Sequence, residues 1–346
     1  MIIELSERVA SGQHLDDASV AAAVEQLVHD QISVEAKAGF LMKLAKKGET
    51  LSEIVAFARE LRSRAINPPI DQETRQRGLI DVCGTGGDHA GTFNISTTVA
   101  FILAAAGIPV AKHGNRAITS KAGSADVLEE LGIAVDLSPD RAAESLRRHN
   151  FAFFFAQAYH PAFKHIGPAR RQCAAQGQRT IFNFLGPLLN PARPQAQVIG
   201  VPKPALCEPL AQALQLLGAS RGMVICGKAG DHWLDEFSTL GSTTISEFYH
   251  ERALSSSVVS EIDFGFPPAQ LRDLAGIDRQ QNAQFIRQIL SGNERGPKRD
   301  IVLLNAGAAF LTAGKSRSIM EGIELAMETI ESGLANSKFS ALAGWK

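Results

Sequence analysis

The chain has 346 residues, of which 45% are hydrophobic and 21% charged, and its formal net charge is −1. This composition is typical of a globular protein with a large core and excludes a disordered or fibrous chain. Because the net charge is close to zero, nothing attracts the whole molecule to nucleic acid or to an anionic membrane. An anionic ligand would therefore need a local cluster of positive charge.

The N-terminus becomes charged within eight residues, too early for a secretory signal peptide. The longest apolar stretch, residues 99–111, is too short to span a bilayer, and we predict a buried helix followed by a strand there. We expect Cys83 to complete a buried strand end and not to act as a nucleophile. The four cysteines are Cys83, Cys173, Cys207 and Cys226, and none of them forms a CxxC pair. We therefore predict neither a metal cluster nor a disulfide framework, and we expect a reduced, cytoplasmic protein.

The first 66 residues predict helices. Residues 16–30 are Ala-rich and amphipathic, and residues 33–47 place apolar side chains at helical spacing behind Ser33, a candidate N-cap. Thr50 and Glu53 form a capping-box pattern at the start of a third helix. Two prolines at positions 68 and 69 end this run. We therefore predict a small, all-helical domain over residues 1–68.

From residue 69 to residue 346, short apolar strands alternate with glycine loops and helices. This alternation predicts an α/β domain with a mainly parallel central sheet covered by helices. Ligands in such domains bind beyond the carboxyl ends of the strands. A helix is predicted over residues 205–217, and the candidate strands are residues 79–82, 109–111, 151–155, 197–201, 222–226 and 301–304.

A glycine loop, Gly84-Thr-Gly-Gly-Asp88, follows the first candidate strand, and residues 94–97 open the next helix. Glycines let a ligand approach the backbone, and the free amides of a turn and a helix start can cradle an anion. The dinucleotide fingerprint and the P-loop fit poorly, because His89 replaces a required glycine and the loop has no Gly-Lys-Ser/Thr. Asp88 is unusual in such a loop: it either meets a cation or a sugar hydroxyl, or it simply caps the turn.

A basic loop over residues 112–124 follows the second candidate strand. It combines Lys112, His113, Arg116 and Lys121 with two glycines and several hydroxyl groups. This combination predicts the local positive charge that the composition as a whole lacks, and with it an anion site. The alternative is a solvated basic turn.

Seven motifs in order resemble the anthranilate phosphoribosyltransferases of tryptophan biosynthesis, over essentially the whole chain. They are Asp81-Val-Cys-Gly-Thr-Gly-Gly-Asp88, Phe93-Asn-Ile-Ser-Thr97, Lys112-His-Gly-Asn-Arg116, residues 123–132, His160-Pro-Ala, residues 179–191 and Leu234-Asp-Glu236. The resemblance implies a helical domain beside a larger α/β domain of the nucleoside phosphorylase and phosphoribosyltransferase type. It also implies a homodimer joined through the helical domains, with a segment near residues 165–187 returning to the small domain.

The implied reaction moves the phosphoribosyl group of 5-phosphoribosyl 1-diphosphate to the amine of anthranilate, the second step from chorismate. It yields N-(5-phosphoribosyl)anthranilate and diphosphate. Carried over by motif, Ser96, Asp235 and Glu236 would hold Mg²⁺, although an Asp-Glu pair taken alone is more typical of a solvated turn. The implied substrate-binding residues are Gly84, Gly87, Asp88, Thr92, Asn94, Ile95, Ser96, Thr97, Lys112, His113, Gly114, Asn115, Arg116, Ala117, Ile118, Thr119, Ser120, Ser124 and Arg170.

For the acceptor, the resemblance implies Asn115 and Arg170, with backbone from Gly84 and with His113 and His160 lining the same site. A guanidinium group suits the anthranilate carboxylate, and we expect Lys112, Asn115 and Arg170 to carry the catalysis. Because an aromatic amine is neutral at pH 7, no dedicated general base is predicted. Positioning should supply much of the rate.

Two alternatives remain open from the sequence. A pyrimidine nucleoside phosphorylase has a similar fold, but that family is longer and carries Lys-His-Ser-Thr-Gly-Gly at the glycine loop. A non-catalytic paralogue that binds nucleic acid would need a broad basic face and would lose acceptor positions, whereas this chain has Asn115 and Arg170 and a net charge near zero. We therefore expect neither nucleic acid nor a membrane among the partners.

Overall fold

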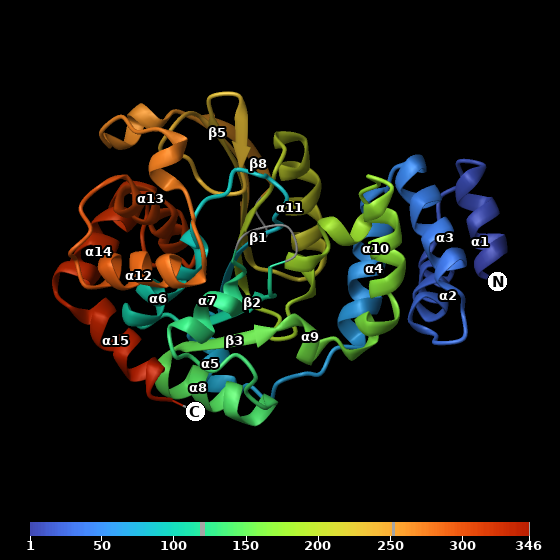
Figure 1. Ribbon diagram of the computed structural model, residues 1–346, viewed down its shortest axis with the longest axis horizontal. Coiled ribbons are helices and arrows are strands. Elements are labelled where there is room, and N and C mark those ends of the chain that lie inside the picture. Colours follow the sequence, from blue (N-terminus) through green and yellow to red (C-terminus); the bar gives the residue numbers. More distant parts are fainter. Residues whose placement is uncertain (118–121, 251–252, 346) are drawn as a thin grey trace.

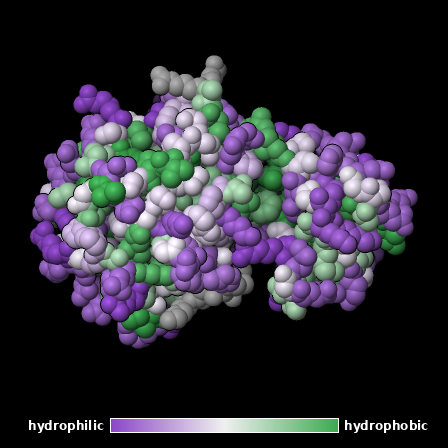
Figure 2. Space-filling model, turned by 90° about the horizontal axis from the view of Figure 1, so that it is seen from above, coloured by the Kyte–Doolittle hydropathy of each residue, from purple (hydrophilic) through white to green (hydrophobic). Residues whose placement is uncertain are grey.

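The computed structural model describes residues 1–117, 122–250 and 253–345. It has two lobes, a small helical lobe at the N-terminus and a larger lobe built around a sheet (Figure 1). Seen from above, an indentation separates the two lobes, and hydrophilic and hydrophobic residues are interspersed on this face (Figure 2). Within the described residues, no helix combines the length and apolarity needed to cross a membrane.

The helical lobe begins with four helices, and side-chain caps fix the starts of three of them. Ser33 accepts from the Ala36 N–H at 3.2 Å, and Thr50 and Glu53 form the reciprocal capping box, which confirms both predicted caps. The four helices are α1 (Ile2–Ala10), α2 (Asp17–Val28), α3 (Val34–Lys47) and α4 (Leu51–Ser63).

Glu53 is fully buried and joins three parts of this lobe. Its carboxylate accepts from the Leu15 N–H at 2.9 Å, from the Thr50 N–H at 2.8 Å and from Lys47 Nζ at 2.8 Å. Burial by itself raises the pKa of Glu53, but these donors outweigh it and the pKa ends below its usual value. The ionised carboxylate is therefore stabilised by the fold.

We expect Glu53→Ala to lower the free energy of unfolding by about 3 kcal/mol, because the buried Lys47 and two amides lose their acceptor. Urea titration measures this, with Glu35→Ala, an exposed site on α3, as the control. Because the pKa of Glu53 is lowered in the fold, its contribution is present above pH ~4.5 and disappears as the pH falls through the lowered pKa. A constant difference between the two proteins across that range would contradict this role.

The larger lobe contains an eight-stranded sheet in the order β3-β2-β1-β4-β5-β7-β8, with β6 paired to β5. The first five strands of this order are parallel, and β6, β7 and β8 are antiparallel, which confirms the predicted mainly parallel α/β architecture. The strands are β1 (Ile80–Gly84), β2 (Val110–Gly114), β3 (Phe151–Phe155), β4 (Ala196–Gly200), β5 (Arg221–Ala229), β6 (His232–Leu234), β7 (Thr243–Tyr249) and β8 (Ser255–Val259).

Helices cover both faces of this sheet (Figure 1). The apolar stretch at residues 99–111 forms a buried helix and then β2, as predicted. The helices of this lobe are α5 (Gln72–Gln76), α6 (Ile95–Ala105), α7 (Ser124–Glu130), α8 (Pro139–His149), α9 (Ala156–Tyr159), α11 (Cys207–Leu216), α12 (Arg279–Leu290), α13 (Pro297–Thr312), α14 (Ile319–Glu331) and α15 (Leu334–Ala343).

The strand predicted at residues 301–304 is wrong. These residues lie in the middle of α13, which starts at Pro297 and is buried over nearly its whole length. A short apolar run has no polar face to reveal its period, so the sequence could not distinguish a buried helix from a buried strand.

Helix α10 (Gly167–Ala175) packs against α3 in the helical lobe, although it comes after β3 in the chain (Figure 1). Lys37 Nζ on α3 donates to the His165 carbonyl at 3.0 Å. The two lobes also share apolar packing, because Phe57 of α4 belongs to the same buried cluster as Leu210 of α11 and Val224 of β5. The segment that contains α10 therefore returns to the helical lobe after β3 and links the two lobes.

Candidate functional site

Two hydrogen bonds, each from a backbone N–H to a carboxylate, hold the glycine loop against Asp235. The Gly86 N–H donates to Asp235 Oδ2 at 2.8 Å, and the Asp235 N–H donates to Asp88 Oδ2 at 3.3 Å. Gly86 and Gly87 have φ of 72° and 82°, a region that side chains avoid. The two carboxylates are thus fixed by the same turn that would cradle an anion.

Two other glycines are required by the closeness of the chain at Asp235. A Cβ on Gly84 would lie 2.2 Å from Asp235 Oδ2, and one on Gly200 would lie 1.6 Å from the Asp235 carbonyl oxygen. Gly84 ends β1 and Gly200 ends the adjacent β4, so the segment after β6 crosses the carboxyl ends of both strands. That crossing brings Asp235 and Glu236 to the glycine loop.

Lys112 lies below this loop and is almost completely buried, with 2% exposure. Its Nζ donates to the Val82 carbonyl at 2.7 Å and to Ser96 Oγ at 3.2 Å, so it connects β1 to the start of α6. Burial lowers the pKa of Lys112, and the nearby carboxylates of Asp81 and Glu236 act in the opposite direction. The charge of this ammonium group acts on the carboxylate of Glu236 and partly offsets the rise in its pKa that burial causes.

The carboxylates at this site repel one another. Burial, then Asp88 and Glu236, raise the pKa of Asp235 well above its usual value, and burial raises the pKa of Glu236 to about 8 despite Lys112 and the Ser96 N–H. A divalent cation would relieve this excess of negative charge. Among the described residues, no three side chains are preassembled as a metal site. Mg²⁺ typically takes one or two carboxylates and completes its shell with water and phosphate oxygens.

Asp81 belongs to the first of the seven motifs, but the sequence predicted no role for it. It is fully buried on β1 and accepts from Asn190 Nδ2 at 2.8 Å, from Gln197 Nε2 at 3.3 Å and from the His113 N–H at 3.3 Å. Burial raises the pKa of Asp81 to about 6. A buried acid at the start of a strand signals such a network, but these three partners lie 32 or more residues away and cannot be identified from spacing.

Cys83 does not have the environment of a nucleophile. It lies on β1. Burial, and to a smaller extent the charge of Asp81, raises the pKa of its thiol well above the usual value. A reactive cysteine needs the opposite shift. Cys83 is half-buried and not fully buried as predicted, but the raised pKa supports a structural role over that of a nucleophile.

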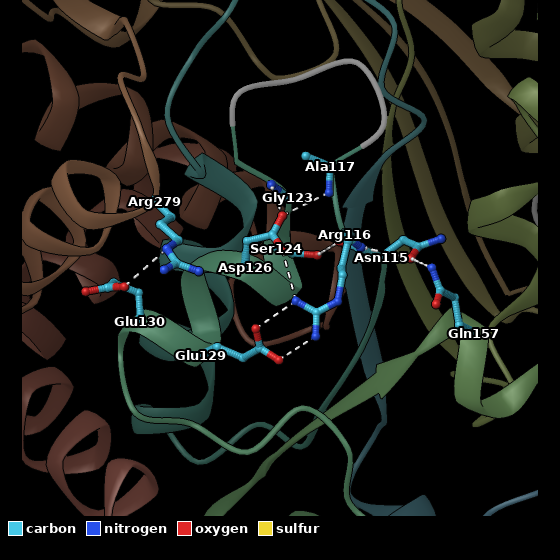
Figure 3. Close-up of polar contacts among 10 residues, drawn as sticks. All are labelled: Asn115, Arg116, Ala117, Gly123, Ser124, Asp126, Glu129, Glu130, Gln157 and Arg279. Carbon is cyan, nitrogen blue, oxygen red and sulfur yellow. Dashed lines mark hydrogen bonds and ion pairs between the residues drawn. The ribbon is translucent and has the colours of Figure 1, made fainter.

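The basic loop binds back onto its own helix (Figure 3). Arg116 contacts Glu129 through both Nη atoms, at 2.7 and 2.6 Å, and Asp126 at 3.1 Å. The Ala117 N–H donates to Asp126 at 2.9 Å, and Ser124 Oγ donates to the Asn115 carbonyl at 3.3 Å. In this arrangement the charge of Arg116 is balanced by Asp126 and Glu129 of α7.

The remaining predicted residues fall into three groups. Asn94 joins two loops, because its Nδ2 donates to the Ala122 carbonyl at 3.3 Å and its Oδ1 accepts from Asn282 at 3.0 Å. Thr92 bridges to Ala275, while Ile95 and Thr97 have buried side chains and could offer only backbone to a ligand. Four residues predicted for this site lie outside the described part of the chain: Ile118, Thr119, Ser120 and Lys121.

A path of packed rings leads from β2 to Arg170. His113 and His160 are 5.3 Å apart between ring centroids, His160 stacks on Phe163 at 5.2 Å, and Phe163 meets Phe182 at 5.8 Å. Arg170 then lies over the Phe182 ring at 5.4 Å. Gly114 follows His113 on the same strand, so this path ends at the basic loop.

Both histidines on this path are neutral. Burial lowers the pKa of His113 to about 3 and that of His160 to about 4. Each retains a buried Nε2 for which the described residues provide no hydrogen-bond partner. The two neutral rings could therefore contact a ligand through their faces, and each Nε2 could form a hydrogen bond with it.

Arg170 is half-buried on α10, and burial lowers its pKa. Its guanidinium makes a long hydrogen bond, 3.5 Å from Nη2 to the Phe182 carbonyl, and the described residues give it no carboxylate partner. A buried guanidinium without a counter-ion suits an anionic ligand. Sequence reasoning missed a second arginine of this segment, Arg179, whose Nη2 donates to the Gly87 carbonyl at 2.9 Å and joins the α10 segment to the glycine loop.

Two family models cover most of the chain. Residues 3–65 match the helical bundle domain of a glycosyl transferase family, and residues 76–336 match the a/b domain of the same family. Two similar relatives carry the name anthranilate phosphoribosyltransferase. The one from Methanocorpusculum labreanum is 44% identical over 99% of this chain and 97% of the relative, and the one from Rubrobacter xylanophilus is 42% identical over 97% and 94%.

Solved structures agree with this. The crystal structure of anthranilate phosphoribosyltransferase from Thermus thermophilus matches with a TM-score of 0.88 and 38% identity, over 99% of this chain and 98% of that one. The enzyme from Saccharomyces cerevisiae in complex with PRPP and Mg matches with a TM-score of 0.87 over 99% and 96%. At 24% identity, the yeast structure supports the fold alone.

Proposed function

The chain belongs to the anthranilate phosphoribosyltransferase family, and we propose that it transfers the phosphoribosyl group of 5-phosphoribosyl 1-diphosphate to the amine of anthranilate in tryptophan biosynthesis. One observation carries the proposal most directly. The structure has two features that suit anions. The glycine loop lies beside buried carboxylates at the edge of the sheet, and Arg170 on α10 is half-buried and has no counter-ion among the described residues. The reaction needs one site for a diphosphate and one for a carboxylate.

The donor is expected to lie on the glycine loop, with its diphosphate against the loop amides and the start of α6. Lys112, whose Nζ contacts Ser96 Oγ at the start of α6, would offset the negative charge that grows on the departing diphosphate. Asp88 would then face either the metal or the ribose hydroxyls. Arg179 holds the far side of the loop in place through the Gly87 carbonyl.

Mg²⁺ is the proposed metal, with Ser96, Asp235 and Glu236 as the residues that would hold it. The repulsion among Asp88, Asp235 and Glu236 supports this, because it adds to burial in raising the pKa values of Asp235 and Glu236, and a bound cation would favour their ionised forms. The relative from yeast was solved with PRPP and Mg. When bound, the metal supplies positive charge for the diphosphate oxygens.

The acceptor is expected between Arg170 and the histidine rings. Arg170 would pair with the anthranilate carboxylate, and His113 and His160 would contact its ring, with Asn115 near the amine. Since burial lowers the pKa of both histidines, neither is charged at pH 7. The amine attacks the anomeric carbon with its own lone pair, so the protein orients it and does not deprotonate it first.

Product analysis tests this function. The purified protein with 5-phosphoribosyl 1-diphosphate, Mg²⁺ and anthranilate should form N-(5-phosphoribosyl)anthranilate and diphosphate in equal amounts, identified by mass spectrometry. Thymidine with phosphate serves as the comparison substrate pair. Release of thymine without any phosphoribosyl transfer would assign the chain to the phosphorylases instead.

Gly84→Ala is expected to raise KM for the donor by about 10- to 100-fold, because the new methyl group must displace Asp235 Oδ2 from the Gly86 amide. KM for anthranilate should change much less. Steady-state kinetics with each substrate varied in turn measures both values. Gly39→Ala is the matched control, because a Cβ there meets nothing within 4 Å. Equal increases in both KM values would show that the methyl group disturbs the whole site.

We also propose a homodimer joined through the helical lobes. Ile3 on α1 supports this, because its side chain is 67% exposed at the outer end of the small lobe (Figure 1). Light scattering should give twice the chain mass, and Ile3→Glu should shift the measured mass toward that of the monomer.

A cytoplasmic location is a further proposal, supported by four cysteines that are all free thiols.

A further inference from the structure

A cavity of about 470 Å³ lies where the end of α4 meets the end of α11. Arg59 and Arg62 of α4 line one side, and Arg193 with Leu216 and Leu217 line the other. None of the residues that line it belongs to the glycine loop, the basic loop or the ring path. The cavity therefore shares no lining residue with the site described above, and it lies between the two lobes.

Positive charge in this cavity exceeds negative charge. Arg62 is 9% exposed, and its Nε and Nη1 donate only to carbonyls, those of Leu188 at 3.1 Å and Leu217 at 3.4 Å. Arg193 is exposed and has no acidic partner among the described residues. Arg59 has one, Asp17 at 3.4 Å, but both side chains are more than half exposed and such a pair is weak.

The guanidinium groups also affect one another. Burial and then the charge of Arg193 lower the pKa of Arg62 to about 10, so Arg62 remains charged at neutral pH beside a like charge. Repulsion between fixed arginines is relieved by an oxyanion, whose oxygens match the planar donors of two or more guanidinium groups.

The other wall of the cavity is apolar. Leu216 is 59% exposed, a large value for leucine, and Leu217 and Pro194 continue the same wall. Exposed leucine beside clustered arginine suits a ligand with an anionic end and an apolar body. The volume is sufficient for a single aromatic ring with one such group.

We propose that this cavity binds a small organic anion, a compact apolar body that carries a phosphate or carboxylate group. Phosphate is favoured, because a dianion interacts with Arg59, Arg62 and Arg193 together. Such a ligand would join α4 of the helical lobe to α11 of the sheet lobe. The ligand would also contact Arg62, whose Nε donates to the Leu188 carbonyl. The carbonyl of the next residue, Leu189, accepts a hydrogen bond from His160.

Calorimetric titration with phenyl phosphate, benzoate and inorganic phosphate tests the proposal. The titrations use Arg170→Ala protein, so that benzoate does not report on the acceptor site. The pocket variant adds Arg59→Gln and Arg193→Gln and leaves the buried Arg62 intact. The charge-matched control adds Arg279→Gln and Arg317→Gln, two exposed arginines elsewhere.

We expect phenyl phosphate to bind more tightly than benzoate and inorganic phosphate, and the pocket variant to weaken it about tenfold or more while the control does not. Benzoate tighter than phenyl phosphate, with the same loss, would assign the cavity to carboxylates. Equal affinity in the pocket variant and the control, or no binding at concentrations on the order of 10 mM, would overturn the proposal. Phosphate held by the glycine loop cannot mimic the result, because both variants retain that loop.

Discussion

Arg170→Ala should raise KM for anthranilate about 100-fold or more and leave KM for the donor within about twofold, because a charge-assisted bidentate contact of this kind contributes several kcal/mol. The expectation rests on the position of Arg170, which is half-buried over the Phe182 ring and has no acidic partner among the described residues. Steady-state kinetics with both substrates varied gives the two values.

Arg171→Ala is the control, since Arg171 is the exposed neighbour on the same helix and should have little effect on either constant. A similar loss for both substrates would show that Arg170 supports the fold of the site and does not bind the carboxylate. A shorter acceptor such as aniline should bind wild type and Arg170→Ala almost equally, because it lacks the group that Arg170 is proposed to hold.

Combined Asp235→Asn and Glu236→Gln should lower kcat/KM on the order of 1000-fold and abolish its dependence on Mg²⁺ concentration, because the proposed metal ligands lose their charge. The free energy of unfolding without metal should be no lower than that of wild type. These side chains lie close to Asp88, and their negative charges repel in the folded state. Activity assays over a Mg²⁺ series and urea titration together measure both parts.

The pair Asp231→Asn and Glu208→Gln makes the same change of charge at exposed positions and should leave both properties near wild type. If the double variant at 235 and 236 loses stability as well as activity, the two carboxylates serve the fold through the Gly86 contact. Retained Mg²⁺ dependence would place the metal elsewhere.

Local patterns in the sequence predicted the framework well. The caps at Ser33 and Thr50, the alternation of strands and helices, and the glycine loop after β1 all depend on residues close together in the chain. The antiparallel strands were missed, since β8 is largely exposed and consists of Ser-Ser-Ser-Val-Val, which has no buried face to give a period of two.

The site was predicted by motif, but its connections were not. The network of Asp81, the contact of Arg179 with Gly87 and the pairing of Arg116 with Glu129 depend on how distant segments pack. Sequence alone presents Arg116 as one more cation for the substrate, whereas the fold balances its charge on α7. The close approach of Asp235 to Gly84 and Gly200 was likewise not predicted, because it depends on the segment that crosses the ends of β1 and β4.

Anthranilate fluorescence offers the most direct measurement of the central claim. In the presence of the protein, 5-phosphoribosyl 1-diphosphate and Mg²⁺, the signal should decay to the end point set by the limiting substrate. Omission of the donor, or of Mg²⁺ with a chelator present, should leave the signal constant. A decay that does not require both, or no decay with all components present, would contradict the proposed transfer.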